Sequence, residues 1–228
     1  TSSWQRSKSM PTSAALADTD RPEITLITDR RRSGSRLGAI VQAAAAAGVD
    51  YVQVREKDLP AAELLALVHD LLRAIGDRPT RLLVNGRLDV ALAAGADGVH
   101  LPDSGLSVAA VRAAFPKLII GASRHTLAAA LAAQDEGADF VVFGPVFATP
   151  GKEARLTGPR PLAEMAGRLR IPVHAVGGID ATCVEQLRGT GARGVAAIRL
   201  FVDTPGERFA TLLEGLRRVL RPAGGDGA

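Results

Sequence analysis

The chain has 228 residues, of which 46% are hydrophobic, 4% are aromatic and 23% are charged. This length suits a single domain, and the apolar content is enough for a large core. The net charge of +4 comes from arginines scattered along the sequence, without a recognition helix or zinc motif, so no nucleic-acid partner is expected. No apolar run approaches the roughly 18 residues of a membrane span. The single cysteine, Cys183, excludes an internal disulfide.

Both ends of the chain differ in composition from the middle. Residues 1–21 are small, polar and charged and contain no apolar signal core, which predicts a disordered N-terminal segment. Residues 221–228, RPAGGDGA, predict a flexible tail. We therefore expect one folded domain over residues 22–220, in a cytoplasmic protein that has no membrane partner.

A repeated phrase organises that domain. A helix-ending stretch, a glycine and a short apolar run recur as AAGVDYVQV from Ala46, AAGADGVHL from Ala93, DEGADFVVF from Asp135 and GTGARGVAAI from Gly189. The glycine is typical of a left-handed helix C-cap. A short, nearly continuous apolar run is typical of a strand that is buried on both faces. These four copies fit the even-numbered strands of a barrel of eight.

Four further apolar runs fall between the copies: ITLIT from Ile24, RLLVN from Arg81, LIIGA from Leu118 and IPVHAVGG from Ile171. Helical patterns separate the runs, as in PAAELLALVHDLLRAI over residues 60–75. Strict alternation of strand and helix predicts parallel strands joined by crossovers. Eight such units, with no GxGxxG after the first strand, favour a (β/α)8 TIM barrel over an open doubly wound sheet.

The fold predicts an active site at the carboxyl ends of the strands. Gly177 and Gly178 follow the seventh strand, before a helix expected to begin near Asp180. Glycine lets the backbone approach an anion, and a helix N-terminus presents free amides. Together with the amides near Ile198 and Arg199, these residues predict a phosphate site; the alternative is a tight turn that needs glycine.

Charged side chains follow other strands at the same face. His125 follows the fifth strand, where an imidazole could move a proton, or could simply cap a helix. Arg55 and Lys57 are two residues apart and would point the same way, toward a second anionic group, unless Glu56 or Asp58 neutralises them. Lys152 lies in the long loop after the sixth strand.

The phrases VQVREK, HL, FGPVFATPGK and IPVHAVGGI resemble those of the thiamine phosphate synthase superfamily, from Ile24 to about Leu220. The superfamily includes the synthase and the TenI-type thiazole tautomerases. The synthase joins a pyrimidine diphosphate to a thiazole phosphate and needs magnesium, held by acids in the phrases NDR and HLGQxD. Here these phrases read NGR and HLPDSG, so Gly86 and Gly105 replace both acids. Asp103 could substitute for one, which keeps the synthase as an alternative.

The NGR phrase, the Leu-Pro pair and His125 resemble the tautomerase branch more closely. The resemblance implies a metal-independent proton shift that aromatises a carboxythiazole phosphate, with His125 as general base and acid and with no cofactor or metal. A third hypothesis is a metabolite-binding regulator without turnover. The expected partners are a thiazole phosphate and a second copy of the chain in a homodimer. The residues expected to bind substrate are Arg55, Lys57, Asn85, Ser123, Thr149, Lys152, and, for its phosphate, Gly177, Gly178, Ile198 and Arg199.

Overall fold

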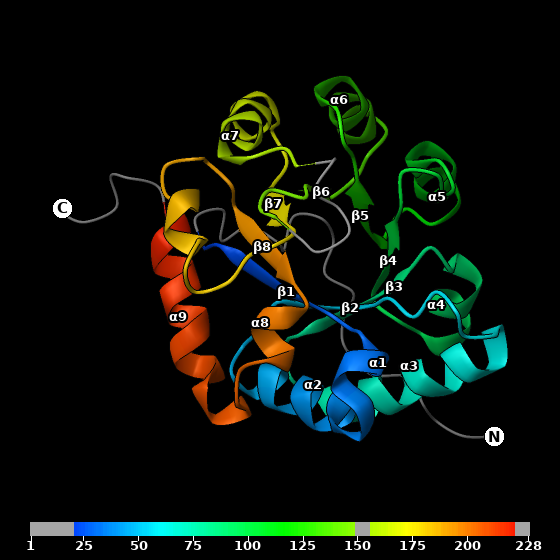
Figure 1. Cartoon of the computed structure of the whole chain (residues 1–228). Coiled ribbons are helices and arrows are strands. Elements are labelled where there is room, and N and C mark those ends of the chain that lie inside the picture. The colour runs from blue at the N-terminus through cyan, green and yellow to red at the C-terminus, as the bar shows by residue number, and fades with distance from the viewer. Residues whose placement is uncertain (1–20, 149–155, 222–228) are drawn as a thin grey trace.

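The computed structural model describes residues 21–148 and 156–221. Its eight strands form a closed barrel in chain order, each parallel to the next, with the last pairing to the first. Figure 1 shows the strands at the centre and the helices around them. The predicted (β/α)8 barrel is therefore confirmed. The strands are β1 (Glu23–Ile27), β2 (Tyr51–Val54), β3 (Arg81–Asn85), β4 (Gly98–Leu101), β5 (Ile119–Ser123), β6 (Phe140–Phe143), β7 (Val173–Val176) and β8 (Gly194–Ala197).

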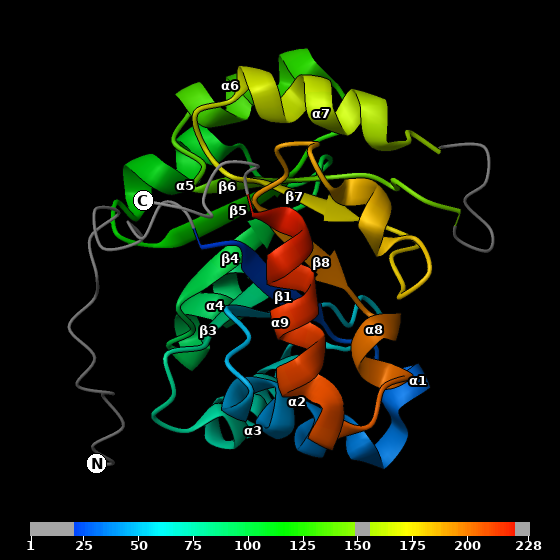
Figure 2. The same cartoon turned by 90° about the vertical axis from the view of Figure 1, so that its left-hand side faces the viewer.

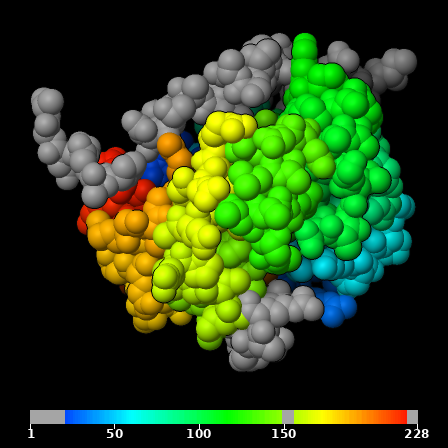
Figure 3. All heavy atoms as spheres, turned by 90° about the horizontal axis from the view of Figure 1, so that it is seen from above, coloured from blue at the N-terminus to red at the C-terminus, as the bar shows by residue number. Residues whose placement is uncertain are grey.

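Helices cover the outside of the barrel. In Figure 2, α6 and α7 lie along one side of the strands while α2 and α3 lie along the opposite side. Figure 3 shows the molecule from above, where the green and yellow-green part of the chain, with α5, α6 and α7, covers the barrel. The helices are α1 (Arg30–Ser33), α2 (Leu37–Ala46), α3 (Ala61–Ile75), α4 (Leu88–Ala94), α5 (Val108–Ala114), α6 (Leu127–Asp135), α7 (Pro159–Arg168), α8 (Arg199–Val202) and α9 (Phe209–Leu220).

The helix predicted over residues 60–75 is α3. Its buried residues, Leu64, Val68, Leu71 and Ile75, recur every three or four positions, which places them on one stripe against the barrel. In the part of the chain that the structure describes, no helix is long and apolar enough to cross a membrane.

The α-helix that was expected to begin near Asp180 is not observed, so that prediction is wrong. The described residues between β7 and β8 contain only the 3-10 helix Val184–Leu187. The Asp180 carboxylate accepts the amides of Thr182 and Cys183 at 2.9 and 3.2 Å. Such side-chain bonds favour a local turn over an α-helix. Gly189 and Gly191, which both have positive φ, follow soon after the 3-10 helix and keep the segment from extending as an α-helix.

Glycines make room for large rings inside the barrel. A Cβ on Gly121 would lie 2.4 Å from the Phe140 ring, and a Cβ on Gly194 would lie 2.4 Å from the His174 ring. The rings of Phe140 and His174 stack with centroids 4.5 Å apart, and Tyr51 lies 5.2 Å from Phe140. The barrel is therefore a packed core rather than a pore, as is usual for this fold.

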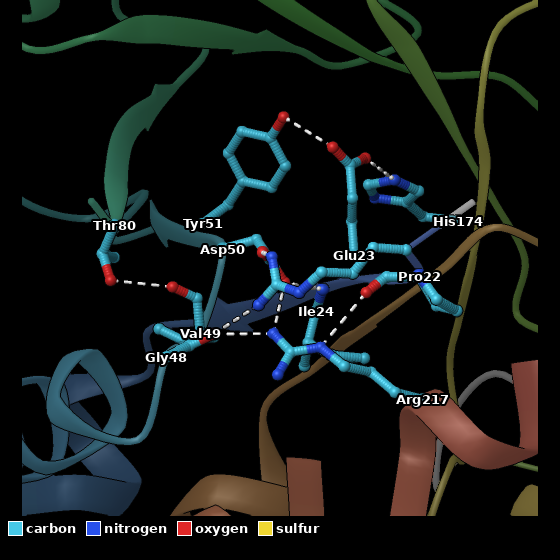
Figure 4. A network of polar contacts seen from close by, with 11 residues as sticks. Pro22, Glu23, Ile24, Gly48, Val49, Asp50, Tyr51, Thr80, His174 and Arg217 are labelled. Atoms are coloured by element: carbon cyan, nitrogen blue, oxygen red, sulfur yellow. Dashed lines mark hydrogen bonds and ion pairs between the residues drawn. The ribbon is translucent and has the colours of Figure 1, made fainter. Parts of the chain in front are cut away.

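A polar network closes the amino end of the barrel, opposite the expected active face (Figure 4). Arg217 of α9 donates to the carbonyl of Gly48 at 2.6 Å and to the carboxylate of Asp50 at 2.9 Å. Asp50 also accepts the amide of Ile24 at 2.8 Å. These bonds fasten the last helix to the starts of β1 and β2.

Candidate active site

A row of polar side chains crosses the carboxyl-end mouth of the barrel from β2 to β5. Gln53 donates through Nε2 to Oδ1 of Asn85 at 3.1 Å. Asn85 pairs in register with His100, whose Nε2 lies 2.7 Å from the Ser123 hydroxyl. Residues at these alternating positions face the interior. The row gives a substrate ring several donors and acceptors at the floor of the mouth.

His100 is uncharged at neutral pH. Its residue is buried, and burial lowers the pKa of the imidazole to about 3, helped by the positive charges of His174, Arg124 and Arg55. Its Nδ1 is buried and has no partner among the described residues. The ring therefore acts as a neutral hydrogen-bonding group. The charges of Arg124 and Arg55 act on this ring in the same direction as burial.

The two carboxylates that follow β2 pair with residues that follow β1 and not with Arg55. Glu56 is buried and turns away from Arg55, toward the Thr28 hydroxyl and the backbone of Arg30. Asp58 pairs with Arg30 and Arg31. Among the described residues Arg55 forms no ion pair, so the alternative in which Glu56 or Asp58 neutralises it does not hold. Arg55 is available to an anionic substrate.

The glycine pair after β7 lies against the loop that follows β6. A Cβ on Gly177 would lie 2.5 Å from Pro145, and a Cβ on Gly178 would lie 2.4 Å from the carbonyl of Ala148. Both glycines have positive φ, 94° and 65°. The tight packing therefore requires glycine here.

Ile198 and Arg199 lie at the neighbouring mouth position, after β8. Ile198 caps the four-residue helix α8 and Arg199 begins it. Both residues are half-buried. Loops after the seventh and eighth strands, with a short extra helix, commonly hold phosphate in this fold. Because β7 and β8 are paired neighbours, these two residues and the glycine pair follow adjacent strands at the mouth, although the helix near Asp180 is absent.

His125 lies just beyond β5 and is exposed. Its Nδ1 lies 3.0 Å from the carbonyl oxygen of Gly144. Because a carbonyl can only accept, Nδ1 carries a proton and donates it to this bond. The imidazole thereby links the segment after β5 to the segment after β6.

Not every predicted site residue can be placed. Thr149 and Lys152 lie outside the described residues. Lys57 is exposed, and because β2 ends at Val54, strand periodicity does not fix its direction relative to Arg55. The sequence did not single out Gln53, His100, Thr28 or Glu56 as site residues, although the alternation of β2 and β4 already aimed Gln53 and His100 inward.

The described residues do not supply the two magnesium-binding carboxylates that are expected of a synthase. Both of the relevant positions are glycine, and both lie near Pro102: a Cβ on Gly86 would lie 3.6 Å from that ring, and a Cβ on Gly105 would lie 3.0 Å away. Asp103 is exposed. In the described ranges no group of three or more His, Cys, Asp or Glu side chains could hold a metal. Magnesium prefers carboxylate oxygens, and these two positions supply none.

Comparison with known proteins places the chain in a family. The family model described as thiamine monophosphate synthase matches residues 24–201, from the second residue of β1 into α8. The chain belongs to this family. The resemblance to the superfamily is thereby confirmed, although nothing assigns the chain to the TenI branch.

Several similar proteins carry names from thiamine phosphate synthesis. A putative thiamine-phosphate synthase of Geobacter sulfurreducens is 45% identical over 187 residues, covering 80% of this chain and 88% of the relative. A thiamine-phosphate synthase of Pyrococcus horikoshii is 34% identical over 202 residues, covering 88% and 96%. The solved thiamine phosphate pyrophosphorylase of Pyrococcus furiosus aligns with a TM-score of 0.77 at 32% identity, covering 89% and 96%.

These names contradict the expected thiazole tautomerase. That prediction is wrong, and so is the isomerase class, because relatives at up to 45% identity are named as synthases. The glycines at positions 86 and 105 misled the sequence argument, since losing the metal carboxylates need not change the reaction. The acid–base role given to His125 belonged to the tautomerase reaction. That His125 belongs to the active site remains a prediction.

Proposed function

We propose that this chain is a thiamine-phosphate synthase, a transferase that joins a pyrimidine diphosphate to a thiazole phosphate and releases pyrophosphate. The observation that carries the proposal is the 45% identity with the Geobacter sulfurreducens relative over 80% of the chain. The site has the matching chemistry. Two anion-binding regions flank a floor of uncharged polar groups, as two phosphorylated ring substrates require.

The thiazole phosphate is assigned to the region after β7 and β8. Gly177 and Gly178 allow close approach of the backbone, and Arg199 begins α8, where the first amides of a helix have no acceptor within it. Backbone amides at such loops hold phosphate without a charged side chain. The phosphate would thus anchor one substrate while its ring reaches the floor.

The diphosphate is assigned to the region after β2 and β5. The charge of Arg55 acts on the neutral His100 ring, and Arg55 forms no ion pair with a described residue, so its guanidinium can donate two parallel hydrogen bonds to a diphosphate. Asn85 and Ser123 would orient the pyrimidine ring through hydrogen bonds. A cation beside the leaving group stabilises the charge that develops as pyrophosphate departs. Lys57, Thr149 and Lys152 complete the proposed substrate-binding set.

A paired assay tests the proposal. Purified protein receives the pyrimidine diphosphate and the thiazole phosphate together, once with magnesium and once with EDTA, and thiamine phosphate and pyrophosphate are measured. Formation of both in a 1:1 ratio is expected in at least one condition. Tight binding of the substrates without any product would contradict the synthase and favour the metabolite-binding regulator. A cytoplasmic location and a homodimer also belong to this proposal, and size-exclusion chromatography with light scattering tests the dimer.

A further inference from the structure

A buried carboxylate lies directly behind the proposed diphosphate region. The Glu56 side chain is only 4% exposed. Its Oε1 accepts the Thr28 hydroxyl at 2.6 Å and the Arg30 amide at 3.0 Å. Thr28 lies in the turn between β1 and α1 and Arg30 is the first residue of α1, both just past the end of β1 in Figure 1. The carboxylate therefore fastens that turn to the end of β2.

One hydroxyl connects this carboxylate to Arg55. The buried Thr28 side chain donates to Glu56 and, through the same oxygen, accepts the backbone amide of Arg55 at 3.0 Å. The Thr28 amide in turn donates to the carbonyl of Gln53 at 3.0 Å. Arg55 lies just past the last residue of β2, so the Thr28 hydroxyl replaces the ladder partner that the strand no longer supplies.

The same arrangement keeps carboxylates away from Arg55. Glu56 is occupied by Thr28 and Arg30, and Asp58 pairs with Arg30 at 2.5 Å and with Arg31 at 2.9 Å. The Arg55 charge is instead felt by His100 at the floor of the mouth. Buried charges are usually paired, and here Glu56 pairs with Thr28 and Arg30, which follow β1. This pairing leaves the guanidinium of Arg55 without an ion pair among the described residues.

We propose that Glu56 and Thr28 are positioning residues of the diphosphate region, which hold the backbone of Arg55 so that its guanidinium faces the mouth. Neither residue touches the substrate. The inference rests on the proposed function for the identity of the ligand, but its first test needs only an anion. Inorganic pyrophosphate is the probe, because it carries the charge and shape of the leaving group.

A matched control separates positioning from general stability. Thr80 is as buried as Thr28, at 1% exposure, and its hydroxyl donates to the carbonyl of Val49 at 2.7 Å. Thr80 lies at the amino end of the barrel (Figure 4), which is the end opposite the mouth. Thr80→Val and Thr28→Val both remove one buried hydroxyl and keep the shape of the side chain. Thr28→Val is expected to lower the free energy of unfolding more, because its hydroxyl makes two hydrogen bonds, one of them to a carboxylate.

Pyrophosphate binding is measured by calorimetry in EDTA for the wild type and four variants. Thr28→Val is expected to weaken binding about tenfold, while Thr28→Ser, which keeps the hydroxyl, stays within about twofold. Glu56→Ala is expected to weaken binding similarly. Thr80→Val is expected to leave the affinity unchanged. With both substrates, Thr28→Val is expected to raise KM for the diphosphate substrate more than it lowers kcat, since ground-state binding is what is lost.

A double-mutant cycle tests whether Thr28 acts through Arg55. Arg55→Met is expected to weaken pyrophosphate binding, and adding Thr28→Val to it is expected to cause no further loss. Equal effects of Thr28→Val with and without Arg55 would overturn the proposal, as would a wild type that does not bind pyrophosphate, or a Thr80→Val variant that loses affinity as Thr28→Val does. If binding behaves as expected but no thiamine phosphate forms, the proposed function fails and the positioning role stands.

Discussion

The imidazole of His174 and the carboxylate of Glu23 meet across Gly194, with Nε2 and Oε2 2.8 Å apart. Each residue pairs in register with Gly194, from β7 on one side and from β1 on the other. Because glycine has no side chain, its two neighbours can touch over it. The Tyr51 hydroxyl donates to the same carboxylate at 3.1 Å. Burial alone would raise the pKa of Glu23, but the bonds from His174 and Tyr51 outweigh it and hold that pKa below 4.5.

This relationship predicts that Gly194→Ala destabilises the barrel. The new Cβ would lie 2.4 Å from the His174 ring and 2.6 Å from the backbone oxygen of Glu23, and the backbone cannot move away without disturbing β1. We expect the free energy of unfolding to fall by about 2 kcal/mol or more in urea titrations. Gly38→Ala is the control, since no atom lies within 4 Å of its Cβ and alanine favours the helix by about 1 kcal/mol. An equal response of the two variants would contradict the packing argument.

The buried His100 predicts a loss of stability in mild acid. Its pKa is about 3 in the folded chain against 6.5 when exposed, so the unfolded state binds more protons between these values and stability falls as the pH falls below 6.5. Between pH 7 and pH 5 this group alone removes about 2 kcal/mol of unfolding free energy.

The measurement is the change in unfolding free energy from pH 7 to pH 5 for the wild type and for His100→Asn. Asparagine does not titrate but can still bond to Ser123. The variant is expected to be less stable at pH 7 and to lose about 2 kcal/mol less on acidification. If both proteins lose the same amount, His100 is not the neutral group described here.

Gly86 and Gly105, the two glycines beside Pro102, are the positions at which aspartates are expected to introduce magnesium dependence. Gly86 has φ of 69°, which aspartate tolerates better than most residues, and its Cβ has room. Gly105 is crowded by Pro102. We therefore expect the triple variant Gly86→Asp, Pro102→Gly, Gly105→Asp to bind pyrophosphate at least about tenfold more tightly with magnesium than with EDTA, since it gains two carboxylate ligands.

Wild type and Gly105→Asp alone are the comparisons for that experiment. The wild type is expected to show a smaller magnesium effect than the triple variant. Gly105→Asp is expected to lower stability by about 1–3 kcal/mol, because its Cβ is 3.0 Å from the proline. A wild type that already shows the full magnesium effect would mean that other carboxylates hold the metal.

Two arginines on one carboxylate predict unequal contributions to stability. Arg21 and Arg217 both pair with Asp50, at 2.6 and 2.9 Å, but their side chains are 46% and 16% exposed. Arg217 also bonds the carbonyl of Gly48. We expect Arg217→Met to lower the free energy of unfolding by about 1–3 kcal/mol and Arg21→Met by less than about 1 kcal/mol. Thermal or urea unfolding measures both losses. A larger loss for Arg21→Met than for Arg217→Met would contradict the role of Arg217 in fastening α9 to the barrel.

The strands were predictable because their signals are local. A run such as FVVF before Gly144 is apolar on both faces, and Gly95, with φ of 65°, ends α4 as its phrase predicted. Alternation of such units leaves few topologies, and the family phrases pointed to the same superfamily. The choice between its branches failed because it relied on two glycines, and a missing ligand says less about the reaction than 45% identity over most of the chain.

Only the tertiary structure decided which side chains meet. Strand periodicity places Gln53, Asn85, His100 and Ser123 on the inner face, but their hydrogen bonds depend on the stagger between neighbouring strands. Sequence allowed Glu56 to neutralise Arg55; the barrel instead turns Glu56 to Thr28, because a residue after the end of β2 takes its partners from the turn beside it. Sequence thus determined the elements and their faces through short-range pattern, while closure of the barrel determined the contacts between residues far apart in the chain.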